Sequence, residues 1–319
     1  MPPELQHMSG SFKNARGQQL SYCALFPPAS EIARLRGVVV WLHGIGEHSR
    51  RYFHLYSRLC AHGFGVLAYD LLAHGESDAC DARGLRMHSP SFQFFVDDSN
   101  AFITFAEREL LPPLLGRSAQ DERPLPPMIL GGMSYGTLVG LHTVLSGEHA
   151  FRAYFLVAPA VSVEMTPVLR VQAVFSKPLS AVLPRWRIVP GVNRDYVCRD
   201  PAFEADFEAD PLTTTGPITT RMGEQSLVAM VAVQNDPRVE QPASIFCQLP
   251  LLFLMGSEDK VTSVPLARQF YERVANADKE FKLFDGFYHA LFDDPEREQA
   301  LAHLVEWLEL RFPAPPSSE

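Results

Sequence analysis

Residues 128–137 read MILGGMSYGT, an apolar run that leads into a glycine-bounded serine and then into a helical pattern. The apolar run predicts a buried strand, and the apolar spacing after Thr137 predicts a helix. Gly132-Met133-Ser134-Tyr135-Gly136 fits the pattern Gly-x-Ser-x-Gly, in which a sharp strand-to-helix turn presents a serine. An ordinary tight turn is the alternative. The strand before Ser134 and the helix after it favour a nucleophile at this position.

The chemistry of such a turn explains its glycines. A turn this sharp holds the serine in a strained backbone conformation and brings the flanking backbones too close for a Cβ. Ser134 would then project at the carboxyl end of the sheet, where doubly wound folds bind their ligands. The N-terminus of the following helix would direct its N–H groups toward developing negative charge.

Along most of the chain, apolar runs rich in β-branched residues alternate with helical patterns. This alternation predicts parallel strands with helices on both faces of the sheet. Eight strands are expected, at residues 10–13, 20–26, 37–42, 65–70, 128–130, 153–157, 250–255 and 280–284. The first two would form a hairpin. Helices are expected at 52–62, 92–111, 137–145, 265–275 and 296–312, the second ending at Pro112-Pro113. The fold class is therefore α/β, with a mostly parallel, doubly wound sheet.

Residues 163–245 interrupt this alternation. An apolar, helix-like stretch at 165–183 carries two prolines, residues 200–210 are acidic, and residues 213–217 form a loop. We expect an irregular, partly helical insertion that acts as a cap or lid over the site, with a solvated elaboration as the alternative. Residues 1–162 and 246–312 would form the core. The Pro/Ser-rich stretch 313–319 is expected to be a disordered tail.

Composition narrows the class of protein. The 319 residues are 46% hydrophobic, enough for a large core, and the net charge of −9 argues against nucleic-acid binding. Five scattered cysteines form neither a disulfide framework nor a metal-ligand pattern, which favours a reducing compartment. The N-terminus lacks a signal-peptide pattern, and no apolar run reaches the roughly 18 residues of a membrane span. We expect a cytoplasmic protein, with peripheral contact at a membrane surface left open.

A serine hydroxyl needs a base within hydrogen-bond reach and an acid that orients the base. The expected chain order is serine, then carboxylate, then histidine. Asp259 follows the strand at 250–255, and His289 follows the strand at 280–284, so both would lie at the same sheet edge as Ser134. Glu258 is the rival carboxylate, and a surface loop histidine is the alternative for His289. The other histidines after Ser134 fall in or beside helical patterns.

Acyl transfer also needs donors aimed at the developing oxyanion. The backbone N–H of Tyr135 is one candidate, and the backbone N–H of Ile45, in the loop His43-Gly44-Ile45-Gly46-Glu47-His48 after an earlier strand, is the other. A metal site at His43 and His48 is a competing idea, disfavoured because no third ligand stands nearby with ligand spacing. We therefore expect neither a metal nor a cofactor.

With these pieces assembled, the chain resembles the α/β-hydrolase fold proteins and, among them, the monoglyceride lipase and lysophospholipase-like family. The likeness covers most of the chain. Its most specific parts are the loop 43–49 with Arg51-Tyr52, similar to that family's HGxGEHSxRY, and Asp70 with Gly75-x-Ser77. Gly256-Ser257-Glu258-Asp259 and Gly286-x-Tyr288-His289 resemble its acid and base loops. The resemblance implies a triad of Ser134, Asp259 and His289 and oxyanion donors at Ile45 and Tyr135.

The resemblance also implies that Glu47 and Arg51 sit near the polar head of the substrate, although a structural ion pair between them is an equal alternative. Three positions depart from the family pattern. Met133 and Tyr135 flank the serine where the family usually has histidine and methionine, and Phe292 stands where it often has a second histidine. These departures place glycerol recognition in question. The apolar stretch around 168–183 would admit an acyl chain or rest on a membrane.

Two classes of function follow from this pattern. The first is a serine carboxylic-ester hydrolase that cleaves a lipid monoester, a monoacylglycerol or lysophospholipid, through an acyl-enzyme. Within the same class, cleavage of a small aromatic or shikimate-type ester and acyl transfer to an alcohol are alternatives. The second class is a ligand receptor that keeps the pocket but does not turn over. The sequence specifies no chain length, head group or oligomeric state.

Overall fold

The computed structural model describes residues 4–118, 121, 123–162 and 173–315. Its centre is an eight-stranded sheet in the order β1-β2-β4-β3-β5-β6-β9-β10. These strands are β1 (Gln6–Lys13), β2 (Gln19–Phe26), β3 (Gly37–Leu42), β4 (Phe64–Tyr69), β5 (Met128–Met133), β6 (Ala153–Val157), β9 (Leu251–Gly256) and β10 (Lys279–Phe284). The pair β1–β2 and the pair β2–β4 are antiparallel, and all later neighbours are parallel. The predicted α/β fold with a mostly parallel sheet is confirmed.

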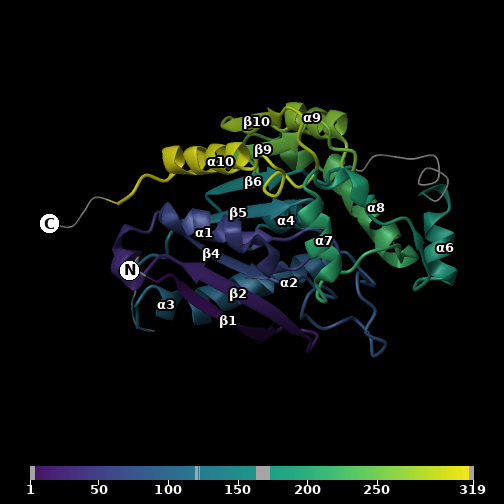
Figure 1. The fold of residues 1–319 in the computed structure, drawn as a ribbon, viewed down its shortest axis with the longest axis horizontal. Helices are drawn as coiled ribbons and strands as arrows, with labels where there is room; N and C mark the ends of the chain where they lie inside the picture. Colours follow the sequence, from purple (N-terminus) through teal and green to yellow (C-terminus); the bar gives the residue numbers. More distant parts are fainter. Residues whose placement is uncertain (1–3, 119–120, 122, 163–172, 316–319) are drawn as a thin grey trace.

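Helices cover both faces of this sheet (Figure 1). The core helices are α1 (Phe53–Ala61), α2 (Gln93–Phe105), α3 (Leu111–Leu114), α4 (Tyr135–Ser146), α9 (Val264–Arg273) and α10 (Glu298–Arg311). Short 3-10 helices span Ala29–Arg34, Ser49–Tyr52, Arg194–Tyr196 and Pro237–Glu240. Side chains of α1 and α10 pack on one face, and those of α2, α4 and α9 pack on the other.

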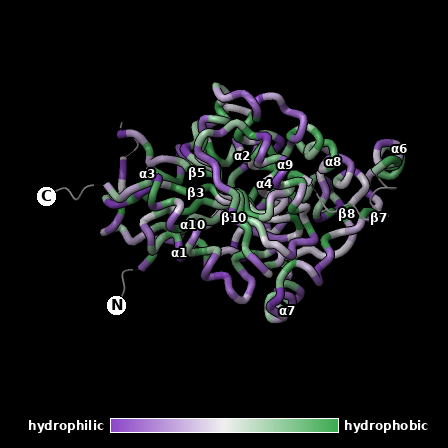
Figure 2. Tube along the Cα trace, turned by 90° about the horizontal axis from the view of Figure 1, so that it is seen from above, coloured by the Kyte–Doolittle hydropathy of each residue, from purple (hydrophilic) through white to green (hydrophobic). Residues whose placement is uncertain are grey.

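The central strands are buried on both faces because their side chains alternate between two cores. Along β3, Val38, Val40 and Leu42 join the core under α2 and α4, whereas Val39 and Trp41 join the core under α1 and α10. Hydrophobic residues accordingly run through the middle of the molecule in Figure 2. A strand buried on both faces reads in the sequence as a continuous apolar run, which is why these strands were predictable.

The predicted end of the helix at 92–111 is wrong. After α2 the chain continues through a π-helix, Ala106–Leu110, into α3, which contains Pro112 and Pro113. Both prolines fall in the first turn of α3, where a backbone N–H needs no partner within the helix. Prolines there start a new helical segment instead of ending the old one.

Between β6 and β9 the chain leaves the sheet and forms α6 (Ser176–Val182), α7 (Pro201–Ala209) and α8 (Thr220–Gln234), with a small antiparallel pair of β7 (Arg187–Val189) and β8 (Ile218–Thr219). These elements gather at one end of the sheet, on the right of Figure 1. The sequence did not predict the β7–β8 pair, because both strands are very short. Residues 163–172, which include the start of the predicted helix-like stretch at 165–183, and residues 316–319 of the predicted disordered tail lie outside the described residues.

All five cysteines carry free thiols. Within the part of the chain that the structure describes, no helix combines the length and apolar character that a membrane crossing requires.

Candidate active site

Ser134 occupies the turn between β5 and α4 in a strained backbone conformation. Its φ is 50° and its ψ is −120°, a region that L-residues rarely adopt. The Ser134 N–H donates to the Val157 carbonyl at 2.9 Å, which ties the turn to the neighbouring strand β6. Such strain persists only where surrounding contacts enforce it, and it concentrates at functional sites.

The glycines around Ser134 are required by close packing. A Cβ on Gly136 would lie 2.1 Å from the Leu42 carbonyl oxygen at the end of β3, and one on Gly131 would lie 2.2 Å from the Phe155 ring. A Cβ on Gly132 would lie 3.0 Å from the Gly136 carbonyl. Only residues without a Cβ allow α4 to begin this close to β3 and β6.

Asp259 and His289 come together at the ends of β9 and β10. His289 Nδ1 lies 2.8 Å from Asp259 Oδ2, and both residues are buried. The rival carboxylate, Glu258, is exposed to solvent. Ser134 and His289 are both described, and the Ser134 hydroxyl makes no hydrogen bond to His289 in this structure. Catalytic hydrogen bonds often shorten only when substrate binds, so this geometry is compatible with a triad.

The Asp259 carboxylate is held by the turn that follows it. Oδ1 accepts the backbone N–H groups of Val261 and Thr262 at 2.8 and 2.9 Å, and Oδ2 accepts the Thr262 hydroxyl at 2.8 Å. Burial alone would raise the pKa of Asp259, but the charge and hydrogen bond of His289 and the donors of Thr262 lower it below its usual value. The carboxylate therefore stays ionised while it orients the imidazole.

His43 sets the orientation of the peptide that carries the Ile45 N–H. His43 Nε2 accepts the Leu71 N–H at 2.9 Å, so the ring proton sits on Nδ1, which donates to the Gly44 carbonyl at 2.7 Å. Burial lowers the pKa of His43 to about 3, which keeps the ring neutral. Because the carbonyl and the following N–H of a trans peptide point in opposite directions, the Ile45 N–H points away from His43.

A second buried residue holds this loop from the side. Asp70, at the end of β4, accepts both the backbone N–H and the hydroxyl of Ser49 at 2.8 and 2.6 Å, and the Glu76 N–H at 2.9 Å. The Ser77 hydroxyl donates to the Asp70 carbonyl at 2.5 Å. The segment from Asp70 to Ser77 therefore anchors the loop after β3 without reaching Ser134 itself.

Ser134, Tyr135 and Ile45 line one mainly apolar cavity of about 260 Å³, which we call the Ser134 cavity. Residues after β7 and on α8 form its opposite wall, including Val192, Leu227 and Met230. Its described lining contains one charged side chain, Lys260, and no carboxylate. The cavity is therefore suited to an apolar group attached to a carbonyl at Ser134.

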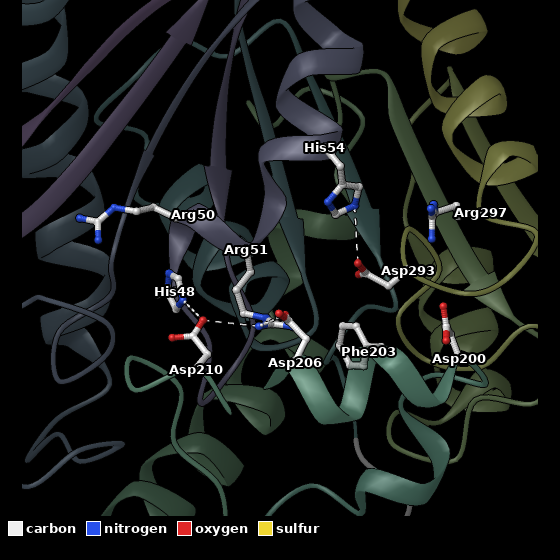
Figure 3. Close-up of a pocket in the computed structure, with 10 residues that line it drawn as sticks. All are labelled: His48, Arg50, Arg51, His54, Asp200, Phe203, Asp206, Asp210, Asp293 and Arg297. Carbon is white, nitrogen blue, oxygen red and sulfur yellow. Dashed lines mark hydrogen bonds and ion pairs between the residues drawn. The ribbon is translucent and has the colours of Figure 1, made fainter. Parts of the chain in front are cut away.

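Arg51 lies in a different, polar pocket of about 400 Å³ between the loop after β3 and α7 (Figure 3). Its guanidinium pairs with Asp206 at 2.9 Å and Asp210 at 3.5 Å, not with Glu47. Glu47 Oε2 instead accepts the Tyr52 hydroxyl and the Gly44 N–H. The ion pair between Glu47 and Arg51 that the sequence left open does not form, and a contact of either residue with a substrate head group stays a prediction.

Near His289, a further carboxylate has an unusual environment. Burial and the negative charge of Glu47 raise the pKa of Asp293 to about 7, against the opposing charges of Arg51 and Arg297. His54 Nε2 lies 3.6 Å from Asp293 Oδ1, as drawn in Figure 3. The polar pocket thus contains a carboxyl group that changes charge near neutral pH.

The three departures from the family pattern pack into the interior. Phe292 is fully buried against Trp41, with ring centroids 6.3 Å apart. Met133 is buried, and its Sδ lies 3.4 Å from the Tyr52 hydroxyl oxygen. The Tyr135 ring packs edge-on against Phe95, and its hydroxyl accepts a hydrogen bond from Ser226 on α8 at 3.4 Å. Position 292 thus contributes a core side chain where the resemblance implied a group that contacts glycerol.

The sequence did not identify Thr262 as a residue that holds Asp259. It also did not identify His43 as a residue that orients the peptide carrying the Ile45 N–H. A threonine three residues after a catalytic carboxylate is a detectable signal, because its hydroxyl can reach back to that carboxylate. Both ring nitrogens of His43 make hydrogen bonds, so a metal bound to His43 would have to displace one of them. The described residues hold no group of three or more His, Cys, Asp or Glu side chains arranged to bind a metal.

Comparison with known proteins agrees with this geometry. Residues 33–296 match the family described as serine aminopeptidase, S33. The chain is 30% identical over 301 residues to the monoacylglycerol lipase of Mycolicibacterium smegmatis, covering 93% of this chain and 95% of that protein. It is 26% identical to the human monoglyceride lipase, in an alignment that covers 93% of this chain and 89% of that protein. In both comparisons nearly the whole of each protein is aligned.

A solved structure extends the likeness to the fold. A soluble variant of the monoglyceride lipase from Saccharomyces cerevisiae, crystallised with a substrate analog, superposes with a TM-score of 0.78 at 20% identity, over 100% of this chain and 97% of that one. At this identity the superposition supports the fold alone. The match to the family model and the identity to the Mycolicibacterium smegmatis protein show that the chain belongs to the serine aminopeptidase, S33, family and, within it, to the monoglyceride lipase-like α/β-hydrolases.

Proposed function

We propose that this protein hydrolyses the ester bond of a lipid monoester, a monoacylglycerol or a lysophospholipid, through Ser134, His289 and Asp259. By family the protein is a carboxylic-ester hydrolase. Relatives named as monoacylglycerol and monoglyceride lipases, and one named as a phospholipase from Bacillus subtilis, support a lipid substrate. The substrate class and the three catalytic roles are our proposal.

The observation that carries this proposal is the lining of the Ser134 cavity. An aminopeptidase would need an acidic group near the scissile bond to bind the charged amino terminus of a peptide. The described lining offers no carboxylate, and most of it is apolar, from Ile45 at one side to Leu227 and Met230 on α8. Burial of an acyl chain there would be favourable by about 0.8 kcal/mol per methylene. An apolar acyl group therefore fits this cavity better than a peptide.

Acylation would begin when Ser134 Oγ attacks the ester carbonyl carbon and passes its proton to His289 Nε2. Asp259, bonded to Nδ1, stabilises the imidazolium that forms. The carbonyl oxygen becomes an oxyanion and accepts the N–H groups of Ile45 and Tyr135. Collapse of this intermediate breaks the bond to the alcohol, which leaves with the proton from His289. The products of this step are the free alcohol and an ester of Ser134.

Deacylation would repeat these steps with water. His289 takes a proton from water, whose oxygen attacks the acyl carbon, and the same two N–H groups stabilise the second oxyanion. Collapse returns the proton to Ser134 Oγ and releases the fatty acid. Transfer of the acyl group to an alcohol would differ only in the nucleophile at this stage. The strained turn at Ser134 keeps the hydroxyl at the cavity wall through both stages.

We further propose that residues 163–245 act as a cap on a core formed by residues 1–162 and 246–312. The described part of this segment supplies much of the wall of the Ser134 cavity, through β7, the residues after it and α8. It also contacts the base loop, because the Ala290 N–H donates to the Val197 carbonyl at 2.7 Å. Movement of this segment would change access to Ser134.

The outer side of the cap has the character of a membrane-binding surface. Val174, Phe175, Val182 and Trp186 are each more than half exposed, which is unusual for large apolar side chains. Residues 173–193 carry Lys177, Arg185 and Arg187 and no acidic residue, although the whole chain has a net charge of −9. In Figures 1 and 2 α6 lies at the outer margin of the molecule. We infer that this surface contacts anionic lipid.

The proposal is tested by turnover of p-nitrophenyl acyl esters by the wild type and by Ser134→Ala. We expect multiple turnovers that Ser134→Ala reduces at least about 10⁴-fold, while Ser226→Ala, a serine in the same cavity, retains most of the activity. A single slow turnover or none would support a receptor and overturn the enzyme assignment. A ranking of kcat/KM for monoacylglycerols, lysophospholipids and aromatic esters then identifies the substrate class. If acyl glycerol forms when glycerol is added to the assay, the enzyme transfers the acyl group to an alcohol.

A further inference from the structure

Two cavities meet at a single partition inside the segment between β6 and β9. The Ser134 cavity, of about 260 Å³, lies on one side. A smaller cavity of about 20 Å³ lies on the other side, beneath α6, where Ala173 and Leu179 line it. Val189, Gly223 and Leu227 border both cavities. These three residues therefore separate the space beside Ser134 from the space beneath α6.

The partition depends on a close approach between β7 and α8 at Gly223. A Cβ on Gly223 would lie 3.0 Å from Val189 Cγ1 and 3.1 Å from Cγ2. Glycine inside a helix is less favourable than alanine by about 1 kcal/mol, so its presence in the first turns of α8 calls for a packing reason. Its missing side chain leaves space that the two Val189 methyl groups occupy.

Beyond the partition, the cover provided by α6 is light. Ser180 is the one residue of α6 that is buried, and Val182 is 76% exposed. α6 is joined to α8 mainly at its end, where the Arg221 side chain donates to the Ser180 carbonyl at 3.2 Å and the Thr220 hydroxyl donates to the Leu183 carbonyl. Phe175, which precedes the lining residue Ser176 in the chain, is 58% exposed.

We propose that Val189, which packs against Gly223, and Leu227, which borders both cavities, form the gate that sets the acyl-chain length this enzyme accepts. Short and medium acyl chains occupy the Ser134 cavity alone. A long acyl chain displaces the Val189 side chain and extends into the space beneath α6. This inference rests on the proposed ester hydrolysis at Ser134, and it assigns the length specificity to residues other than the proposed triad and oxyanion donors.

The test compares kcat/KM for p-nitrophenyl butanoate, octanoate and hexadecanoate in the wild type, Val189→Ala and Leu227→Ala. We expect the ratio of hexadecanoate to octanoate to rise about tenfold when either side chain is truncated, which is the discrimination typical of one or two methylenes in an apolar pocket. Val192→Ala is the matched control. Val192 is also a valine of the Ser134 cavity, but it does not border the cavity beneath α6. It should leave the ratio within about twofold of the wild type.

The possible outcomes distinguish a failure of the proposed gate from a failure of the proposed ester hydrolysis. If the wild type and both gate variants cleave butanoate but the ratio of the long to the medium ester does not move, the gate is wrong and ester hydrolysis stands. An equal rise in Val192→Ala would also overturn the gate, because any enlargement of the cavity would then suffice. If Ser134-dependent cleavage of every ester is missing, the proposed function and the gate fall together. Leu227→Ala keeps the test decisive should Val189→Ala fail to fold.

Discussion

His48 Nε2 lies 2.7 Å from Asp210 Oδ2, so a histidine of the loop after β3 is bonded to the residue that follows α7 (Figure 3). Arg51 reinforces this contact from the same loop, and the Thr214 N–H donates to the Gly46 carbonyl at 2.8 Å. Burial opposes ionisation of Asp210, but the His48 hydrogen bond and the Leu212 N–H lower its pKa below the usual value. The segment between β6 and β9 thus braces the loop that carries the Ile45 N–H.

Replacing Asp210 with asparagine should loosen this brace. The variant removes the charge that pairs with both His48 and Arg51, and we expect kcat for a short ester to fall about tenfold, because small displacements of a catalytic donor are costly. Asp206→Asn is the matched control, since the Asp206 side chain is 74% exposed and contacts Arg51 alone in the loop. The measurement is steady-state kinetics together with thermal unfolding. Unchanged kcat in Asp210→Asn would refute the coupling.

Thr262 should act as a positioning residue for Asp259. Thr262→Val keeps the shape of the side chain and the backbone N–H but removes the hydroxyl donor to Asp259 Oδ2. We expect kcat to fall about tenfold with little change in KM, because the carboxylate loses one of the bonds that orient it. Thr262→Ser, which retains the hydroxyl, should recover most of the rate. If valine and serine behave alike, the hydroxyl has no positioning role.

Two buried histidines predict a loss of stability in acid. Burial lowers the pKa of His43 and of His74 to about 3, whereas an unfolded histidine titrates near pH 6.5. Between these values the unfolded chain binds more protons than the folded one, so the free energy of unfolding decreases as the pH falls through this window. Within this window, each histidine makes the free energy of unfolding decrease by about 1 kcal/mol for each pH unit that the pH falls.

The pH dependence is measured by urea unfolding at several pH values below neutrality. His74→Phe removes one of the two groups and replaces a ring that packs edge-on near Phe95 with another aromatic ring. It should make the dependence on pH less steep. A free energy of unfolding that stays level as the medium is acidified would show that these histidines already become protonated in the folded protein.

Trp186 should report contact with lipid. We expect the wild type to sediment with anionic phosphatidylglycerol vesicles, with a blue shift of tryptophan fluorescence, and to bind neutral phosphatidylcholine vesicles several-fold more weakly. Replacing Phe175 and Val182 together with serine should reduce sedimentation without changing the cleavage of soluble butanoate ester. Val231→Ser, an exposed apolar residue on α8, is the control. Equal binding of all variants to the vesicles would place the contact elsewhere.

The sequence by itself determined the α/β class, the eight strands and the strained serine turn. Strands buried on both faces leave continuous apolar runs, and the glycines of 131–136 mark positions where no Cβ fits. These are local signals, because each depends on residues adjacent in the chain. The order of serine, carboxylate and histidine was also readable, since the ends of parallel strands share one edge of the sheet.

Only the tertiary structure decided which side chains meet. It brought Asp259 and not Glu258 to His289, although the two carboxylates are neighbours in the chain. It also paired Arg51 with α7, more than 150 residues away, and it set the partition at Val189. Side-chain direction at the end of a strand and contacts between distant segments depend on how the whole chain packs. No periodicity within one segment encodes such relationships.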